Sequence, residues 1–207
     1  MITLAREARQ RGWWEEYRDV LGGTLPEFEA EASRILSYKS LLLPGLLQTA
    51  DYARAIFRGG QVVDEAALDR RVEARLTRQR ILDQPNPPQM WTIIDEAALL
   101  KHIGGVKVMH RQLLHLIDMA MRPNIGIQVL PNAVGAHAAL ENAFTILEFA
   151  APEDPSLVYI EMLTGDAYLE LHEQLARYTM AYDHVRASAL SAEASAEYLA
   201  ELAARLE

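Results

Sequence analysis

The spacing of apolar residues changes at about residue 88 of the chain. Up to about residue 88 they recur three and four positions apart, which predicts helices with one buried face. The clearest example is residues 63–82, in which Leu68, Val72 and Leu76 lie four apart. The stretch "DQPNPP" follows, and its prolines cannot lie inside a helix. We therefore predict two subdomains within one compact unit, a helical one over residues 1–88 and a sheet-and-helix one over residues 89–207.

The stretch "LLLPGLLQTADYARAIF", residues 41–57, interrupts an apolar run with Pro44-Gly45 and then introduces polar residues. Proline in the first turn of a helix loses only a donor that is unpaired there anyway. We therefore predict that Leu43-Pro44 begins an amphipathic helix, with Gln48 and Tyr52 on one polar stripe. Two more helices are predicted before this corner, over residues 11–21, ended by Gly22-Gly23, and over residues 27–40.

Beyond residue 88, short runs rich in β-branched and aromatic residues are separated by turn residues, which predicts strands. These runs cover residues 89–95, 124–131, 143–149 and 157–163. Helices are predicted over residues 96–105, 109–121 and 171–190, and from Ser191, a residue type that often caps helices. The order predicts an α+β or α/β fold, with an N-terminal helical subdomain packed on a small mixed sheet of about four strands and closed by two C-terminal helices.

Charge is unevenly distributed along the 207 residues, whose formal net charge is −9. Residues 1–122 hold 17 basic and 16 acidic side chains, whereas residues 123–207 hold 3 basic and 13 acidic ones. Because nucleic-acid binding depends on Lys and Arg that neutralise phosphates, we expect no direct nucleic-acid binding by this chain. No apolar run approaches the roughly 18 residues of a membrane span, and cysteine is absent, so we expect a cytoplasmic protein that does not enter a membrane.

Arginines form the first candidate group for binding. Arg71, Arg75 and Arg78 fall on one face of the helix predicted over residues 63–82, where they could bind an anionic ligand or an acidic partner. A solvated face, paired with acidic neighbours three or four positions away, explains the same spacing.

Three further places in the second half could carry binding groups. Asp95-Glu96 end a strand and begin a helix, a position where ligand sites of α/β layers lie, although helix capping explains carboxylates there equally well. His137 lies in a loop between two strands, where binding residues concentrate, although a structural histidine also fits. Glu161 interrupts an apolar run, so it either faces water or pairs with a cation in a cleft.

Short motifs of known chemistry are missing from the sequence. There is no Gly-rich phosphate loop, no G-x-S-x-G, no H-E-x-x-H and no cluster of His, Asp and Glu with metal-ligand spacing. His110 and His115 are five apart rather than the four that would place two ligands on one helix face. We therefore assign no catalytic residue, no metal and no cofactor from the sequence.

Several stretches, taken in order, resemble a known family. They include "RGWWEEY", "SLLLPGLLQTADYARAI", "VEARLTRQRIL", "IIDEAAL", "IGIQVLP", "GAHAAL" and "VYIEMLTGDAYLE". Together they resemble the C-terminal domain of unknown function in WhiJ-like helix-turn-helix regulators of actinobacteria. The resemblance covers the chain from Arg11 onward, and "PGLLQT..YA" with "R..RQ" is its most specific part.

The resemblance implies a cytoplasmic transcriptional regulator, in which a helix-turn-helix binds DNA and this domain receives a small molecule or a small cognate protein. Only a short stretch precedes Trp13-Trp14 here, so we expect the DNA-binding part to be missing from this chain. The alternatives are a small enzyme that uses carboxylate and histidine groups in the same cleft, and a toxin-like protein neutralised by a partner. A homodimer is compatible with each of them.

We predict that the N-terminal helices and the C-terminal layer meet at a single cleft that binds the ligand or partner. A dispersed set of caps and surface charges is the alternative. The residues predicted to line the cleft are Gln48, Tyr52, Asp95, Glu96, His137 and Glu161, with Arg75 or Arg78 near its rim.

Overall fold

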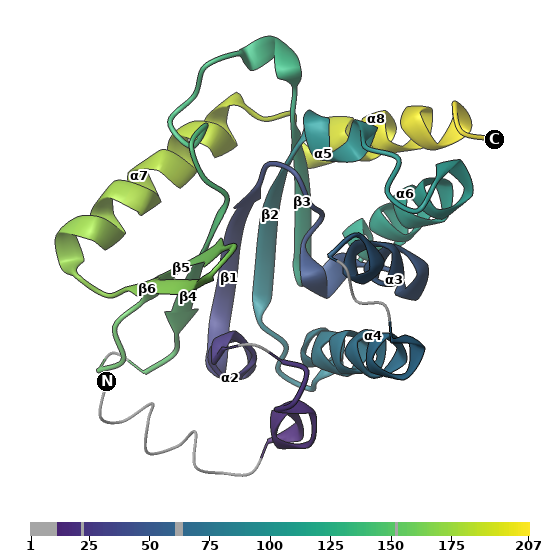
Figure 1. Ribbon diagram of the computed structural model, residues 1–207. Helices are drawn as coiled ribbons and strands as arrows, with labels where there is room; N and C mark the ends of the chain where they lie inside the picture. Colours follow the sequence, from purple (N-terminus) through teal and green to yellow (C-terminus); the bar gives the residue numbers. More distant parts are fainter. Residues whose placement is uncertain (1–11, 22, 61–63, 152) are drawn as a thin grey trace.

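The computed structural model describes residues 12–21, 23–60, 64–151 and 153–207, which form a three-layered arrangement of helices and strands (Figure 1). A mixed sheet of six strands lies between two layers of helices. The strands are β1 (Ala32–Lys39), β2 (Gln89–Asp95), β3 (Ile125–Leu130), β4 (Phe144–Phe149), β5 (Leu157–Met162) and β6 (Gly165–Leu169).

Helices connect and cover the strands. The α-helices are α2 (Leu25–Glu31), α3 (Ala50–Gly59), α4 (Glu65–Gln79), α5 (Glu96–Leu100), α6 (Val106–Ala120), α7 (His172–Ser188) and α8 (Ala192–Ala204). Short 3-10 helices are η1 (Trp13–Tyr17), η2 (Gly45–Leu47), η3 (Arg80–Asp83) and η4 (Asn132–Val134). Figure 1 shows α7 alone on one side of the sheet and α3, α4, α6 and α8 on the other.

The strand order is β3-β2-β1-β4-β5-β6. β1, β2 and β3 run parallel, whereas β4 lies antiparallel to β1, and β5 and β6 continue the antiparallel pairing. The chain therefore builds the sheet outward from β1 in one direction and then returns to the other side of β1. The carboxyl end of β1 is thus the topological switch point, where open α/β sheets commonly bind ligands.

The prediction of about four strands was low because β1 and β6 were missed. Residues 27–40 were predicted as one helix, but α2 ends at Glu31 and β1 begins at once at Ala32. Ile35 packs into the core on one face of the sheet, and Leu36 and Tyr38 pack into the core on the other. A strand buried on both faces does not alternate, so its sequence cannot be told from a buried helix by periodicity. The two predicted subdomains consequently share one sheet.

The Leu-Pro-Gly corner also differs from the prediction. Pro44 precedes a single 3-10 turn, η2, and Gln48 is extended, with φ −87° and ψ 139°. α3 begins only at Ala50, where the hydroxyl of Thr49 caps it by accepting a hydrogen bond from the backbone N–H of Tyr52 (3.3 Å). The prediction that Gln48 and Tyr52 share one stripe of a helix is therefore wrong, because Gln48 lies outside the helix.

Most other elements agree with the prediction. The strands predicted after residue 88 correspond to β2, β3, β4 and β5, and Ser191 caps α8 by accepting from the N–H of Ala194 (3.1 Å). α4 confirms the helix predicted over residues 63–82, although Val63 lies outside the described residues. Arg11 and Gly22, which were predicted to bound the first helix, also lie outside them; the described part of that segment is the 3-10 helix η1.

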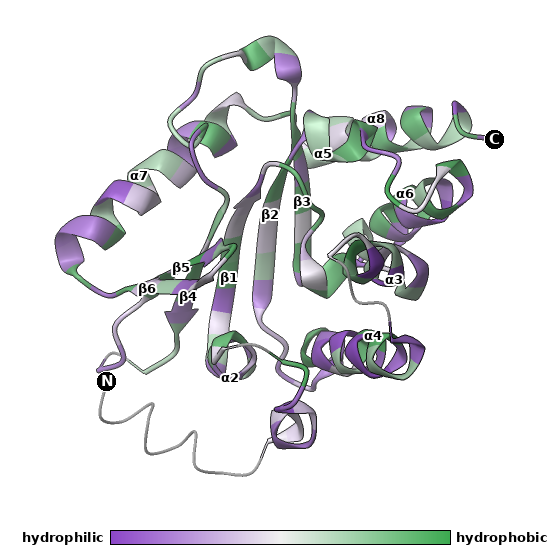
Figure 2. Cartoon of the chain, in the orientation of Figure 1, coloured by the Kyte–Doolittle hydropathy of each residue, from purple (hydrophilic) through white to green (hydrophobic). Residues whose placement is uncertain are grey.

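Two apolar cores hold the layers together. One packs α3, α6 and α8 against the sheet and includes Leu47, Tyr52 and Leu113; the other packs α7 against the opposite face and includes Tyr182 and Val185. Figure 2 shows strongly hydrophilic residues along α4, although Leu68 in this helix is fully buried. In the part of the chain that the structure describes, no helix combines the length and apolar character needed to cross a membrane.

Candidate functional site

The turn over residues 43–49 leaves β1 at the switch point and is held by amide side chains. Gln79 donates through Nε2 to the carbonyls of Gly45 (2.9 Å) and Gln48 (2.7 Å). Gln112 donates to the carbonyl of Leu47 (2.7 Å) and accepts from the N–H of Thr49 (2.7 Å). Because α4 and α6 both satisfy backbone groups of this turn, its conformation is fixed by tertiary contacts.

Gln48 and Tyr52 are buried inside this arrangement. Gln48 donates through Nε2 to the carbonyl of Leu43 (2.7 Å), and its Oε1 accepts from Nη1 of Arg75 (2.6 Å). The hydroxyl of Tyr52 accepts from the N–H of Leu43 (3.3 Å), and burial raises the pKa of this phenol. Tyr52 therefore supports the turn from within the core, whereas Gln48 positions a charged neighbour.

Arg75 is the first cation of the site. Its guanidinium lies over the ring of Phe57, 4.7 Å from the ring centroid, while Nη1 is held by Gln48. Burial, helped by the like charge of Arg78, lowers the pKa of Arg75 to about 10. Half-buried arginine is usually compensated by a carboxylate. Here the hydrogen-bonding partner is a neutral amide.

Arg78, one turn further along α4, has such a carboxylate. Its Nε and Nη2 donate to the two oxygens of Glu29 at 2.5 and 2.7 Å, and only 4% of the Glu29 side chain is exposed. Bidentate pairing of this kind orients both partners and satisfies the charges that burial would otherwise penalise. The alternative of a solvated arginine face is therefore wrong for Arg75 and Arg78.

Lys39 is a second cation without a bound carboxylate, and no pattern in the sequence points to it. It ends β1 on the same sheet face as Ile35, and its Nζ donates to the hydroxyl of Thr145 on β4 (3.0 Å). Burial lowers the pKa of Lys39, and the charges of Arg75 and Arg78 lower it further, while Glu161 and Glu29 raise it. The side chain had been assigned to a helix, so its proximity to Arg75 had no signal in the sequence.

Glu161 completes this charged group on the same face. Tyr159, two residues earlier on β5, packs into the core below α2 and pairs with Thr145 across the sheet. Glu161 itself is exposed, but its charge acts on both Lys39 and Arg75. Among the described residues, no carboxylate oxygen lies within 4.0 Å of the charged nitrogens of Lys39 or Arg75. We call the set Lys39, Arg75, Arg78, Glu29 and Glu161 the basic cluster.

The other face of the sheet carries a separate polar chain. The hydroxyl of Tyr38 donates to Oδ2 of Asp95 (2.9 Å) and lies 3.3 Å from Nε2 of His137. Nδ1 of His137 accepts from the N–H of Ala139 (3.3 Å), which leaves Nε2 as the protonated nitrogen that donates to Tyr38. Oδ1 of Asp95 caps α5 by accepting from the N–H of Ala97 (2.9 Å). The two interpretations of Asp95, helix cap and member of a polar group, are therefore both observed.

A pocket of about 620 Å³ opens beside the hydrogen-bonded group of Tyr38, Asp95 and His137, between the loop that follows β3 and the end of α7. Small residues and two histidines, His137 and His184, line it. His137 is only 6% exposed and both of its ring nitrogens have partners, so it fastens the loop to the sheet rather than presenting a nitrogen to the pocket. Because both ring nitrogens of His137 have hydrogen-bond partners, this histidine gives no specific support to the alternative of an enzyme.

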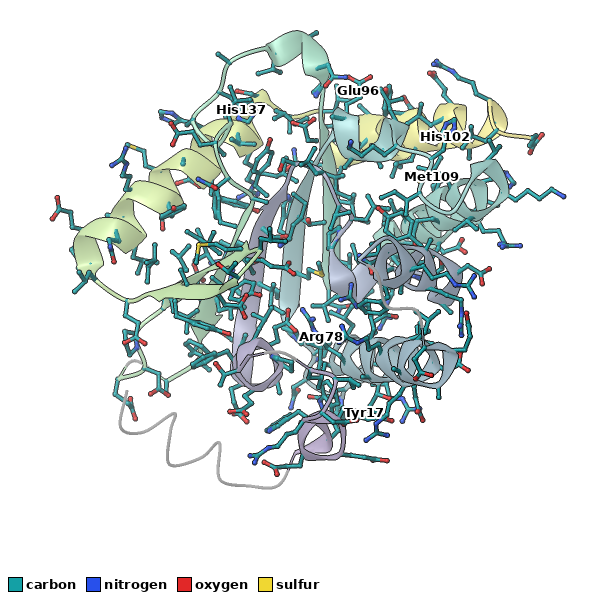
Figure 3. The ribbon with its side chains drawn as sticks, in the orientation of Figure 1. Tyr17, Arg78, Glu96, His102, Met109 and His137 are labelled. Carbon is teal, nitrogen blue, oxygen red and sulfur yellow. The ribbon has the colours of Figure 1, made fainter. Side chains whose placement is uncertain are left out.

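The prediction of a single cleft is wrong. Figure 3 shows His137 beside α7 and Arg78 beside α4, on opposite sides of the sheet, and Glu96 at a third place near α8. Glu96 accepts from the N–H of Asn132 (2.7 Å) and from the hydroxyl of Tyr198, so it ties α5 to η4 and α8. The sheet thus divides the predicted residues into Gln48, Tyr52, Arg75, Arg78 and Glu161 on one face, Asp95 and His137 on the other, and Glu96 at the edge.

The two most specific stretches of the family resemblance meet in the structure. "PGLLQT" supplies the turn, and "R..RQ" supplies Arg75, Arg78 and Gln79, whose contacts with the turn are given above. In the described residues, no three side chains of the types that bind metals gather into a metal-binding group.

A protein-family model matches most of the chain. Residues 23–201 match the model of the domain of unknown function DUF5753, so the chain belongs to this family. No curated protein and no solved structure matches the chain.

Proposed function

We propose that this chain is the ligand-sensing effector domain of an actinobacterial transcriptional regulator that acts in the cytoplasm. The observation that carries the ligand-binding part is the pair of half-buried cations, Lys39 and Arg75, that lack a bound carboxylate; Gln48 holds Arg75 against the turn over residues 43–49. Buried groups with perturbed pKa values concentrate at functional sites, and this pair lies at the switch point of the sheet. The regulator part rests on the resemblance to WhiJ-like proteins.

A sensing role fits the way the site is connected. The turn over residues 43–49 contacts α4 through Gln79 and α6 through Gln112, so a ligand that shifts Arg75 would act on the turn and on both helices. A ligand changes an equilibrium only if it binds the two states differently, and a site shared by several elements allows such a difference. We propose that the ligand changes how these helices present themselves to the DNA-binding part or to a partner.

Equilibrium dialysis of the purified chain against an actinobacterial small-molecule extract tests this proposal. Mass spectrometry should find at least one compound retained by the wild-type chain and lost with a Lys39→Met, Arg75→Met double variant. Lys107→Met is the control, because Lys107 is exposed on α6, outside the basic cluster. Identical retention by wild type and double variant contradicts the ligand-sensing function and favours recognition of a small cognate protein, the other role implied by the resemblance.

Regulation is tested by joining the chain to the helix-turn-helix of a WhiJ-like regulator. Fluorescence anisotropy should show a change in DNA affinity when the retained compound is added, and no change in the double variant. Coupling between sites is typically worth about 1–3 kcal/mol, or about a 5- to 150-fold change in affinity. An unchanged affinity at saturating compound would contradict the sensing role.

A further inference from the structure

Charges in the basic cluster do not balance locally. Arg78 and Glu29 neutralise each other through two hydrogen bonds, which leaves Lys39 and Arg75 facing the exposed carboxylate of Glu161. Glu161 acts on both cations at a distance but forms no ion pair of 4.0 Å or less with either among the described residues. This local positive surplus lies in a chain whose overall formal charge is −9.

The two cations are held by contacts that leave donors unused. Lysine has three N–H donors and Lys39 uses one on Thr145; arginine has five and Arg75 uses Nη1 on Gln48. The ring of Phe57 and the amide of Gln48 fix the plane of the Arg75 guanidinium. A planar guanidinium that is oriented in advance loses less entropy when it binds an oxyanion.

At Gly45 the backbone of the turn passes close to the guanidinium groups of Arg75 and Arg78. A Cβ atom at this position would lie 3.4 Å from Nη1 of Arg75 and 3.7 Å from Nη1 of Arg78. The backbone of the turn therefore approaches both guanidinium groups without a side chain between them.

We propose that Lys39 and Arg75 bind a compact oxyanion, the carboxylate or phosphate group of a small organic ligand, beneath the turn over residues 43–49. This inference rests on the proposed ligand-sensing function and specifies the chemistry of its site. Arg78 stays paired with Glu29, and its positive charge adds to the electrostatic attraction of the anion. The negative charge of Glu161 repels the anion and so raises the concentration at which it binds. The anion supplies the charge that Lys39 and Arg75 lack, and the hydrogen bonds that it accepts are charge-assisted and therefore strong.

The lowered pKa values of Lys39 and Arg75 support this arrangement independently of the donor geometry. Each reflects a cation that burial penalises more than the charges of Glu161 and Glu29 stabilise it. A bound anion would reverse this effect by stabilising the charged forms.

Thermal unfolding of the full chain in the presence of inorganic phosphate, acetate or succinate, with sodium chloride at equal ionic strength as reference, tests the proposal. At about 10 mM, phosphate or one of the carboxylates should raise the wild-type Tm by about 3 °C above the chloride reference. The arm that responds identifies the source of the oxyanion. Lys39→Met and Arg75→Gln should abolish the rise, and Lys107→Met should retain it.

In two variants, the expected changes in Tm and in anion binding have directions that a merely structural role would not produce. In chloride alone, Lys39→Met should melt at or above the wild-type temperature, because it removes an uncompensated charge from a half-buried position. Glu161→Gln should strengthen the response to the oxyanion several-fold in half-saturation concentration, because it removes the opposing charge. A Lys39→Met chain that melts lower than wild type in chloride and still responds to the anion overturns the proposal, as does an equal response of all variants.

Failure of this inference and failure of the proposed function give different results. If dialysis recovers a ligand that depends on Lys39 and Arg75 while no oxyanion shifts the Tm, the sensing function stands and the anionic chemistry is wrong. If oxyanions bind but DNA affinity never responds, the anion site stands and the sensing role is wrong.

Discussion

Arg75 is both a structural contact of the turn over residues 43–49 and a candidate ligand-binding group. Its guanidinium is positioned by an amide and an aromatic ring, and its nearest charged neighbour on α4, Arg78, has the same sign. A side chain that only stabilised the fold would gain more from a carboxylate, as Arg78 does from Glu29. At Gly45 the turn lies close to both guanidinium groups, with room for no more than a small side chain between them.

Substitution Gly45→Val tests this close approach. The branched side chain would crowd Nη1 of Arg75, which lies 3.4 Å from the position of a Cβ atom. We expect a loss of about 1–3 kcal/mol in the free energy of unfolding, measured by urea denaturation, together with a loss of oxyanion binding. Gly45→Ala is the matched control, since one methyl group reaches only ordinary contact distance and should cost much less. Equal stability of the valine variant and wild type would show that a larger side chain fits between Gly45 and Arg75, which contradicts the close approach.

His115 on α6 gives a pH-dependent contribution to stability. Its Nε2 is buried with no hydrogen-bond partner in the described chain, and burial lowers the pKa of this imidazole below its usual 6.5. The folded state therefore binds fewer protons than the unfolded state at mildly acidic pH, so stability falls as the pH drops below about 6.5. In His115→Gln the difference in unfolding free energy between neutral and mildly acidic buffer should shrink. The same substitution at exposed His102 is the control for replacing a surface histidine by glutamine.

At the scale of single elements, sequence patterns located β2, β3, β4 and β5 but missed the inner strand β1 and the edge strand β6. β2, β3 and β4 are dense runs of β-branched and aromatic residues bounded by Pro, Asn and Gly, and these signals are local. β1 has no turn residue at its start, since α2 passes directly into it at Ala32. β6, with the sequence "GDAYL", is short and poor in β-branched residues. Both strands exist because of the strands beside them, and that information is not local.

The candidate site was recoverable only in part for the same reason. Gln48, Arg75 and Arg78 were selected from the sequence, but the hydrogen bond between Arg75 and Gln48 joins residues 27 positions apart and required the path of α4 under the turn. Lys39 and Tyr38 were missed because they were assigned to a helix, in which neighbouring residues do not point to opposite faces. In β1 they do, so one serves the basic cluster and the other the polar chain at His137.

Packing between β2 and β3 depends on a glycine. A Cβ atom at Gly126 would lie 2.4 Å from Cε3 of Trp91, whose ring is held by a hydrogen bond from Nε1 to Gln128 (2.7 Å) and by Arg186, 4.7 Å above it. Gly126→Ala should therefore displace the indole and cost about 1–3 kcal/mol of unfolding free energy. A change in the near-ultraviolet circular dichroism of tryptophan should accompany the loss. Gly59→Ala, where a Cβ atom meets nothing within 4 Å, is the control; it should not lower the unfolding free energy and should leave the circular dichroism unaltered.

At the scale of the whole molecule, the negative charge of this chain disfavours contact with the nucleic acid that the proposed parent regulator would bind. The excess of acidic side chains lies beyond residue 122, in the segment that supplies α7 and α8. The basic cluster is half-buried, and its arginines are engaged with Glu29 and Gln48. Phosphate groups of a duplex need exposed cations in a row, so we expect DNA contact to come from another part of the regulator.

An electrophoretic mobility shift assay of the chain alone tests this expectation. At low ionic strength and low micromolar protein, the chain should not retard duplex DNA, because repulsion by the acidic segment outweighs any contact with scattered basic residues. Retardation that weakens as salt is added would contradict the expectation that this chain does not bind DNA itself. A strongly basic DNA-binding domain measured in parallel is the positive control.

The central position of β1 has a consequence for how the chain is made. β1 is synthesised before the other described strands, yet Ser37 bonds to Thr92 55 residues later, and Ser33 bonds to Glu148 115 residues later. Until β2 and β4 have been synthesised, both long edges of this mostly buried strand are open to pairing with other nascent chains. Folding must therefore wait for distant partners, which predicts a slow search and a need for chaperones. A fragment that stops at residue 88 would keep β1 permanently in this exposed state and should accumulate as aggregates.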